Sequence, residues 1–192
     1  GDRQRRFGTL RYDAGPPARV AVVFDRLLVD QTVRAQNRHY IFDGTHLVER
    51  LEDRKQFFKR RIVEEGEEAA DPLGLGEGPF AIPLRADPET LLERFNVERR
   101  PLKETKTASP DRPQRVRLRF VPKDPEAADF RVAEIWYDRD RGWPVRWRSE
   151  DRSENISVIE LSQVKTGVAI APEAFDTTPP DGPGWQVEIR GE

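Results

Sequence analysis

The side chains that most often carry out chemistry are few in this chain, and the clearest group surrounds one turn. The only two histidines, His39 and His46, flank Asp43-Gly44. If this dipeptide forms the loop of a hairpin, His39 faces Val48 and His46 faces Ile41, which makes the imidazoles diagonal neighbours on one sheet face. Two imidazoles and a carboxylate could bind a metal ion, but no further ligand motif accompanies them. We therefore predict no metal site and no cofactor.

Carboxylates are abundant, and a pair of them could serve as the acid and base of a glycosidase. The clearest pairs are Glu64-Glu65, Glu67-Glu68, and Asp138 with Asp140. All lie in segments typical of turns or loops, where such runs are usually solvated. The glycine-rich segment 73–80 lacks the basic residue and the following helix that a phosphate-binding loop needs. We predict that the chain is not an enzyme, and a hydrolase with a carboxylate pair is the enzymatic alternative.

Aromatic and basic residues interleave in the second half of the chain, at Trp136-Tyr137, Trp143 and Trp147-Arg148. Such a pattern could stack the bases of a single strand. However, 33 basic and 35 acidic residues leave a net charge of −2, which gives no long-range attraction for nucleic acid. The 27 arginines are scattered, and most have an acidic neighbour in the sequence. We expect them on solvated faces and predict no nucleic-acid partner.

Length and composition favour a single domain over residues 1–192, because a chain of this size can enclose one sizeable core. Cysteine is absent, which excludes disulfides and thiolate chemistry. No run approaches the roughly 20 apolar residues that span a bilayer, and none resembles the apolar core of a signal peptide.

Alternating apolar and polar residues, rich in β-branched and aromatic types, predict antiparallel strands along most of the chain. Gly, Pro, Asn and Asp separate these runs, so we expect a meander. In the first part the predicted strands are 7–12, 19–24, 27–35, 38–42, 45–51 and 56–63. In the second part they are 115–120, 130–137, 144–148 and 156–164.

Two segments interrupt the predicted strands. Residues 64–83 are rich in Gly, Pro and acids and are typical of a long loop, and 99–113 is a polar insert that we expect to be disordered. Between them, Asp87-Pro88-Glu89 predicts the start of a short helix, with Asp87 as N-cap. The apolar face of this helix would carry Leu91, Leu92 and Phe95.

Three segments together resemble a known family. Residues 40–47 contain an Asp-Gly turn followed three places later by Leu47; residues 120–123 precede a strand and the 138–142 turn; residues 174–182 contain a Phe, a Pro-Pro pair and a Gly. In this order, and from about Phe7 to Val187, the chain resembles the periplasmic outer-membrane lipoprotein carrier family (LolA-like proteins).

The resemblance implies a mainly β fold: a curved, unclosed antiparallel β-barrel with short helices covering its concave side. It also implies an apolar cavity for lipid or lipoprotein acyl chains, no catalysis, and a periplasmic or otherwise exported monomer that meets membrane-associated transport partners. We expect the cavity wall to contain Leu10, Tyr12, Val22, Phe24, Phe42, Leu118, Phe120, Ile135 and Trp147. The lid would contain Phe80, Leu91, Leu92 and Phe95.

The chain also departs from the family pattern. The family's first helix has no counterpart before Phe7, and the arginine that latches the family's lid would fall near Gly15-Pro16-Pro17, where there is none. Arg19 is close to this place but out of register. An envelope sensor or protein-interaction module, using the same fold without transport, is therefore the alternative function.

Overall fold

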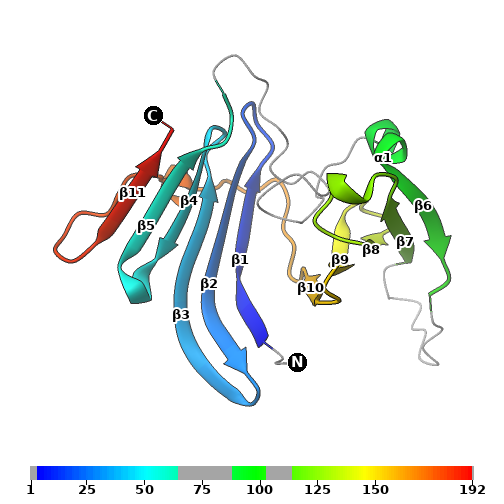
Figure 1. Cartoon of the computed structure of the whole chain (residues 1–192), viewed down its shortest axis with the longest axis horizontal. Coiled ribbons are helices and arrows are strands. Elements are labelled where there is room, and N and C mark those ends of the chain that lie inside the picture. The colour runs from blue at the N-terminus through cyan, green and yellow to red at the C-terminus, as the bar shows by residue number, and fades with distance from the viewer. Residues whose placement is uncertain (1–3, 65–87, 103–113, 192) are drawn as a thin grey trace. The chain divides into compact units, whose positions relative to one another are not determined.

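The computed structural model describes residues 4–64, 88–102 and 114–191. Its backbone groups into two compact units, each built around one sheet (Figure 1). Unit 1 consists of Gly1–Pro72 and Val168–Glu192, and unit 2 of Leu73–Gly167. The expectation that residues 1–192 form one domain stays a prediction, since two compact groups can belong to one domain or to two.

Unit 1 contains a six-stranded sheet in the order β1-β2-β3-β4-β5-β11. Its first five strands form the predicted antiparallel meander, and β2 and β3 bend along their length (Figure 1). The elements are β1 (Gln4–Asp13), β2 (Arg19–Val29), β3 (Thr32–Phe42), β4 (His46–Leu51), the 3-10 turn η1 (Glu52–Arg54), β5 (Gln56–Arg61), the 3-10 turn η3 (Pro172–Phe175) and β11 (Gln186–Arg190).

Where the sequence predicts three short strands between residues 19 and 42, the structure has two long ones. A bulge between Phe24 and Arg26 lets β2 continue through the expected break. The reversal occurs instead after Val29, where Asp30 adopts a φ of 54° and Val29 pairs with Thr32. The prediction of one strand over 27–35 is therefore wrong, because Asp can adopt the left-handed conformation that a tight turn requires.

The last strand, β11, is parallel to β5 and pairs Val187 with Phe57. The sequence analysis did not predict this strand, although Val187 and Ile189 alternate with Gln186, Glu188 and Arg190 in the expected way. Its position brings the end of the chain back to the edge of the first meander.

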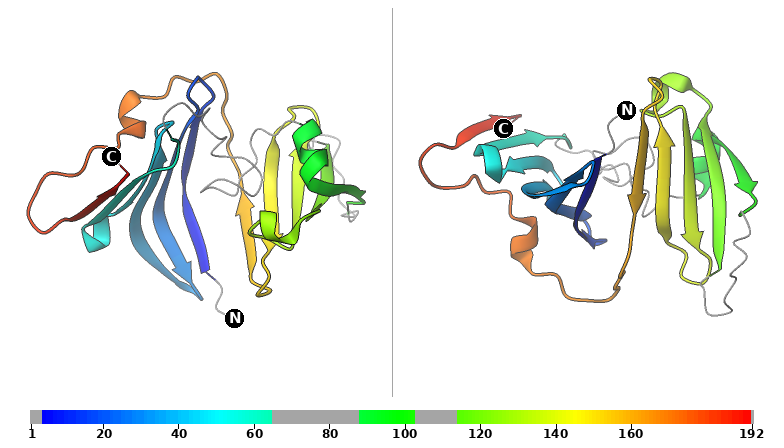
Figure 2. Two further views of the ribbon diagram at one scale, coloured as in Figure 1. Left: turned by 45° about the horizontal axis from the view of Figure 1, so that its top comes forward. Right: turned by 90° about the horizontal axis from the view of Figure 1, so that it is seen from below.

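One face of the unit 1 sheet is covered by the segment that precedes β11. Buried Ala21, Ile41, Val48 and Phe57 form a cluster with Phe175 of η3. Three partly buried residues of the same segment also pack on this cluster: Ile170, Ala174 and Trp185. Figure 2 shows η3 in orange beside the strands. We call this side of the sheet the Ile41 face.

Unit 2 contains a five-stranded antiparallel sheet in the order β10-β9-β8-β7-β6 (Figure 2, right). Its apolar face packs into a core of Phe95, Phe120, Ala128, Phe130, Ala133, Ile135 and Trp147. The elements are α1 (Pro88–Arg94), β6 (Phe95–Arg100), β7 (Arg115–Pro122), the 3-10 turn η2 (Pro125–Ala127), β8 (Val132–Asp138), β9 (Pro144–Glu150) and β10 (Ile156–Glu160).

Short helical segments cover the apolar face of the unit 2 sheet. Leu91 of α1 packs on the core, and so does Ala128, which follows η2. Helix α1 begins at Pro88 as expected but ends at Arg94, so Phe95 starts β6 and does not lie on the helix. Among the described strands neither sheet closes on itself. The predicted fold class, a mainly β structure with a curved, unclosed antiparallel arrangement and short helices, is confirmed. The described strands form two sheets where one unclosed barrel was expected, and β11 pairs with β5 in parallel.

No helix in the described part of the chain is long and apolar enough to cross a membrane.

The close approach of β1 and β2 gives a test of the fold at Gly8. A Cβ atom added there would lie 2.0 Å from the carbonyl oxygen of Val23, whereas one added to Gly15 would meet nothing nearer than 3.4 Å. We expect Gly8→Ala to lower the free energy of unfolding by about 1–3 kcal/mol, because β1 must move away from β2.

Urea denaturation followed by circular dichroism measures this effect, with Gly15→Ala as the matched control. Equal stability of the two variants would contradict the tight β1–β2 register at the bulge.

Candidate functional site

The Asp43 hairpin differs from its predicted register by two residues. Ile41 pairs with Val48 and His39 with Arg50, while the Asp43 amide donates to the His46 carbonyl at 3.2 Å. Gly44 and Thr45 therefore form the loop, and only Gly44 has a positive φ, of 106°. The predicted pairing of His39 with Val48 is wrong. The two histidines share a face, as expected, but they are not diagonal neighbours.

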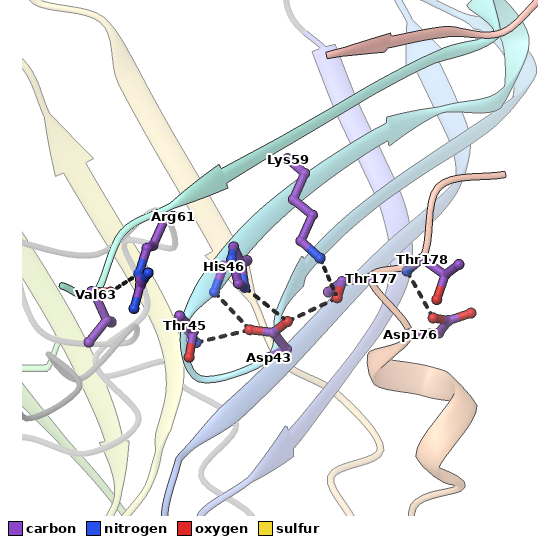
Figure 3. Close-up of polar contacts among 9 residues, drawn as sticks. All are labelled: Asp43, Thr45, His46, Lys59, Arg61, Val63, Asp176, Thr177 and Thr178. Atoms are coloured by element: carbon purple, nitrogen blue, oxygen red, sulfur yellow. Dashed lines mark hydrogen bonds and ion pairs between the residues drawn. The ribbon is translucent and has the colours of Figure 1, made fainter. Parts of the chain in front are cut away.

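The Asp43 carboxylate causes this shift because it takes the place of a backbone acceptor. One oxygen accepts the amides of Thr45 at 2.9 Å and His46 at 2.7 Å (Figure 3). The other oxygen accepts the Thr177 hydroxyl at 2.9 Å and lies 3.6 Å from Nδ1 of His46. The Thr177 oxygen in turn accepts Nζ of Lys59 at 3.3 Å. A single half-buried carboxylate thus joins the β3–β4 turn to the segment that covers the Ile41 face.

These contacts also set the proton affinity of the group. Burial tends to raise the pKa of Asp43. The hydrogen bonds that its carboxylate accepts from the amides of His46 and Thr45 and from the Thr177 hydroxyl outweigh this effect, so the pKa lies below its usual value. Asp43 is therefore charged at neutral pH, and it stabilises the fold in that state.

The contacts of the Asp43 cluster connect parts of the fold. Asp43 and His46 lie close together, but Thr177 donates its proton to the carboxylate and not to the imidazole. His39 is held separately, with Nε2 at 2.7 Å from Oδ1 of Asn37, and burial followed by the nearby Arg50 lowers its pKa. Within residues 4–64, 88–102 and 114–191, no three His, Asp or Glu side chains could hold a metal ion together.

The predicted cavity-wall residues of unit 1 all lie on one face of its sheet. Leu10 pairs with Val22 and Val20 with Phe42, and Tyr12 and Phe24 have the same side-chain direction in this register. Three residues that the prediction missed share this side, and their alternation in the sequence could have revealed them: Val20, Leu47 and Leu51. We call this side the Phe42 face.

Burial varies along the Phe42 face. Val20 and Phe42 are fully buried, and Val22, Leu47 and Leu51 are nearly so. Leu10, Tyr12 and Phe24 are partly exposed, and the rings of Phe24 and Tyr40 meet edge to face at 6.1 Å. The part of the face formed by β1 and the second half of β2 therefore still offers apolar surface.

The predicted wall residues of unit 2 also share one face, but here their own side chains fill the space. Leu118 pairs with Ile135, and Ile135 with Trp147. Phe120, Ile135 and Trp147 are buried in the core described above, and Leu118 packs against it. The ring of Phe130 contacts Trp147 edge to face at 5.8 Å.

The predicted lid residues have different environments. Leu91 is partly buried against the unit 2 core and Phe95 is buried within it, where its ring stacks on Phe130 at 5.7 Å. Leu92 is 57% exposed. Phe80 and nearly all of the predicted loop over 64–83 lie outside the described residues, as does most of the 99–113 insert. The assignment of these side chains to a cavity wall and a lid stays a prediction.

Arg19, the residue nearest to the position of the family's latch arginine, has a different role. Its guanidinium forms an ion pair with Asp13 at 2.5 Å and lies 4.6 Å from the ring of Phe175. This ion pair lowers the pKa of the Asp13 carboxyl group, mainly through the hydrogen bond that Arg19 donates. Arg19 therefore holds the covering segment on the Ile41 face, on the opposite side of the sheet from the Phe42 face.

Comparisons with known proteins identify no family for this chain, since no family model and no curated sequence matches it. Among solved structures, it is similar to a crystal structure from Vibrio parahaemolyticus provisionally named an outer membrane lipoprotein-sorting protein domain. The identity is 14%, the TM-score is 0.34, and the match covers 84% of this chain but 64% of that one. A likeness at this level carries no argument about function, and the family membership stays a prediction.

The role of Asp43 can be tested by stability against pH. Its pKa is depressed in the folded chain, so its contribution is present above the unfolded value of about 4 and is lost as pH falls through the folded pKa. We expect Asp43→Asn to lower the free energy of unfolding at pH 7 by about 1–2 kcal/mol.

Thermal melts between about pH 3 and pH 7 measure this change, and Asp43→Asn should flatten the acid limb of the curve. Asp181→Asn serves as the control, because Asp181 is exposed and lies in the 174–182 segment that also contains Thr177. The same flattening in both variants would show that Asp43 has no special role.

Proposed function

We propose that the chain is a non-enzymatic binder or carrier of lipid acyl chains that acts in the cell envelope, outside the inner membrane, as a monomer. The observation that supports this proposal is the Phe42 face, where four adjacent strands place eight apolar side chains on one side of a curved sheet. Five of these side chains are buried, and Leu10, Tyr12 and Phe24 keep apolar surface exposed on β1 and β2. Exposed apolar surface beside a buried apolar floor is typical of a ligand-binding site.

The two faces of the unit 1 sheet differ in what covers them. The Ile41 face is packed by η3 and its neighbouring residues, which belong to the same unit. On the Phe42 face, Leu10, Tyr12 and Phe24 retain exposed surface. An acyl chain lying along β1 and β2 would contact these three side chains first, and the more deeply buried Val22 and Phe42 would form the floor beneath it.

The energy available from such a contact is sufficient for binding without any polar recognition. Burial of one methylene contributes about 0.8 kcal/mol, so about ten methylenes would contribute roughly 8 kcal/mol before the cost of ordering the ligand. Because this attraction is non-directional, it suits a carrier that accepts acyl chains of different structure.

The proposal can be tested by titrating a fluorescent fatty-acid analogue into the purified chain. We expect Phe24→Ser to weaken binding about tenfold, because removal of a contacting aromatic ring costs 1.5 kcal/mol or more, at about 1.4 kcal/mol per tenfold change. Val23→Ser is the matched control, since it removes a half-buried apolar side chain from the next position of β2, on the Ile41 face.

Mass spectrometry of gently extracted protein should in addition recover acyl species. An equal effect of both variants would contradict binding on the Phe42 face. Retention of a protein from an envelope extract, without any lipid, would favour the sensor alternative and overturn the carrier proposal.

A further inference from the structure

A second surface, on unit 2, has the chemistry of an anion site. At the ends of β6 and β7 the structure has an open depression of about 310 Å³. Four arginines and three apolar residues line it: Arg99, Arg100, Arg115, Arg117, Pro101, Leu102 and Val116. We call this depression the arginine rim. Its volume is at the lower end of the range for small-molecule sites.

The register of the sheet concentrates positive charge at the arginine rim. Arg100 of β6 pairs directly with Arg117 of β7, and Arg99 lies beside Arg100 on the other side of the strand. Like charges directly opposite each other on neighbouring strands destabilise a sheet. Carboxylates of the same sheet offset the repulsion between these two guanidinium groups.

The acidic residues near the arginine rim already have partners within unit 2. Glu98 binds Arg100 at 2.9 Å, and Glu134 binds Arg117 at 2.5 Å. Asp138, which faces Arg115 across the sheet, is buried and accepts the amides of Asp140 and Arg141 in its own turn.

Two arginines of the rim have no carboxylate partner in the part of the chain that the structure describes. Among the described residues no acidic side chain lies within ion-pair distance of Arg99 or Arg115. Elsewhere on the same sheet the arginines are neutralised, as Arg146 is by Glu160 at 3.1 Å and Arg131 is by Glu150. Among the described arginines of these five strands, Arg99 and Arg115 are therefore the two without an acidic partner.

We propose that the arginine rim binds the phosphate group of a phosphate ester. Guanidinium groups present paired N–H donors that match the oxygens of a phosphate, and they remain charged at every physiological pH. The apolar lining, with Leu102 41% exposed beside Val116, suits the organic part of an ester better than a bare inorganic ion. This site does not depend on acyl-chain binding at the Phe42 face, and either one can exist without the other.

Calorimetric titration of the full chain with glycerol 3-phosphate at low salt tests the proposal. We expect saturable binding that Arg99→Gln with Arg115→Gln weakens at least about tenfold. The matched control is Arg11→Gln with Arg34→Gln, which removes the same charge from exposed positions on unit 1. Circular dichroism would establish that both double variants are folded, as expected for exposed side chains.

Sedimentation with vesicles identifies the source of the phosphate. Vesicles of phosphatidylcholine containing phosphatidylglycerol, compared with phosphatidylcholine alone, distinguish a lipid headgroup from a free ester. Binding of glycerol 3-phosphate without vesicle binding supports a site for free esters, and vesicle binding that needs Arg99 and Arg115 supports a headgroup site. No binding of either probe, or equal loss in the control variant, would overturn the proposal. Acyl-chain binding by the same Arg99/Arg115 variant should remain unchanged.

Discussion

The arrangement of unit 1 depends on the hydrogen bonds of one carboxylate. Asp43 joins residues that are 134 positions apart in the chain, because the group that closes the β3–β4 turn also accepts the hydroxyl of Thr177. Arg19 adds a second attachment through the ring of Phe175. These polar contacts are few, but they determine where the covering segment lies, while the apolar contacts of Ile41, Val48 and Phe57 supply most of its stabilisation.

The same use of aspartate recurs in both units. Asp138 accepts the amides of Asp140 and Arg141, and Asp151 accepts those of Ser153 and Asn155, as Asp43 does in its own turn. In each case a carboxylate satisfies amides that a tight turn leaves without backbone acceptors. These three aspartates therefore have a local structural role, whereas other carboxylates pair with arginines, as Glu98, Glu134 and Glu150 do.

The alternation of residue types was sufficient to predict most strands and the side on which their apolar residues lie. The five predicted wall residues of unit 1 share one face because a period of two fixes side-chain direction whatever the partner strand. Partners and registers are not determined in this way. The loop of the Asp43 hairpin lies one residue later than predicted, and the strand pairing therefore shifts by two, because the Asp43 side chain competes with the backbone for an amide. The Asp30 turn was missed because a bulge extends β2 past its expected end.

The candidate sites were predictable to different degrees. A sequence pattern can identify an apolar face, but whether the face is filled depends on which distant segments pack on it, as Phe130 and Phe95 do in unit 2. The arginine rim was missed because scattered arginines resemble a solvated surface in the sequence. The sheet brings these arginines together by pairing Arg100 with Arg117, and among the described residues Arg99 and Arg115 have no acidic partner.

The two-part composition of unit 1 has a consequence for the order in which the chain folds during synthesis. All strands of unit 2 lie in one continuous stretch, so this unit can fold as soon as it has been made. The Ile41 face receives its cover only when Phe175, Thr177 and β11 have emerged. The growing chain therefore presents the Ile41 face without its cover while residues 62–167 are made, and unit 1, although begun first, is completed after unit 2.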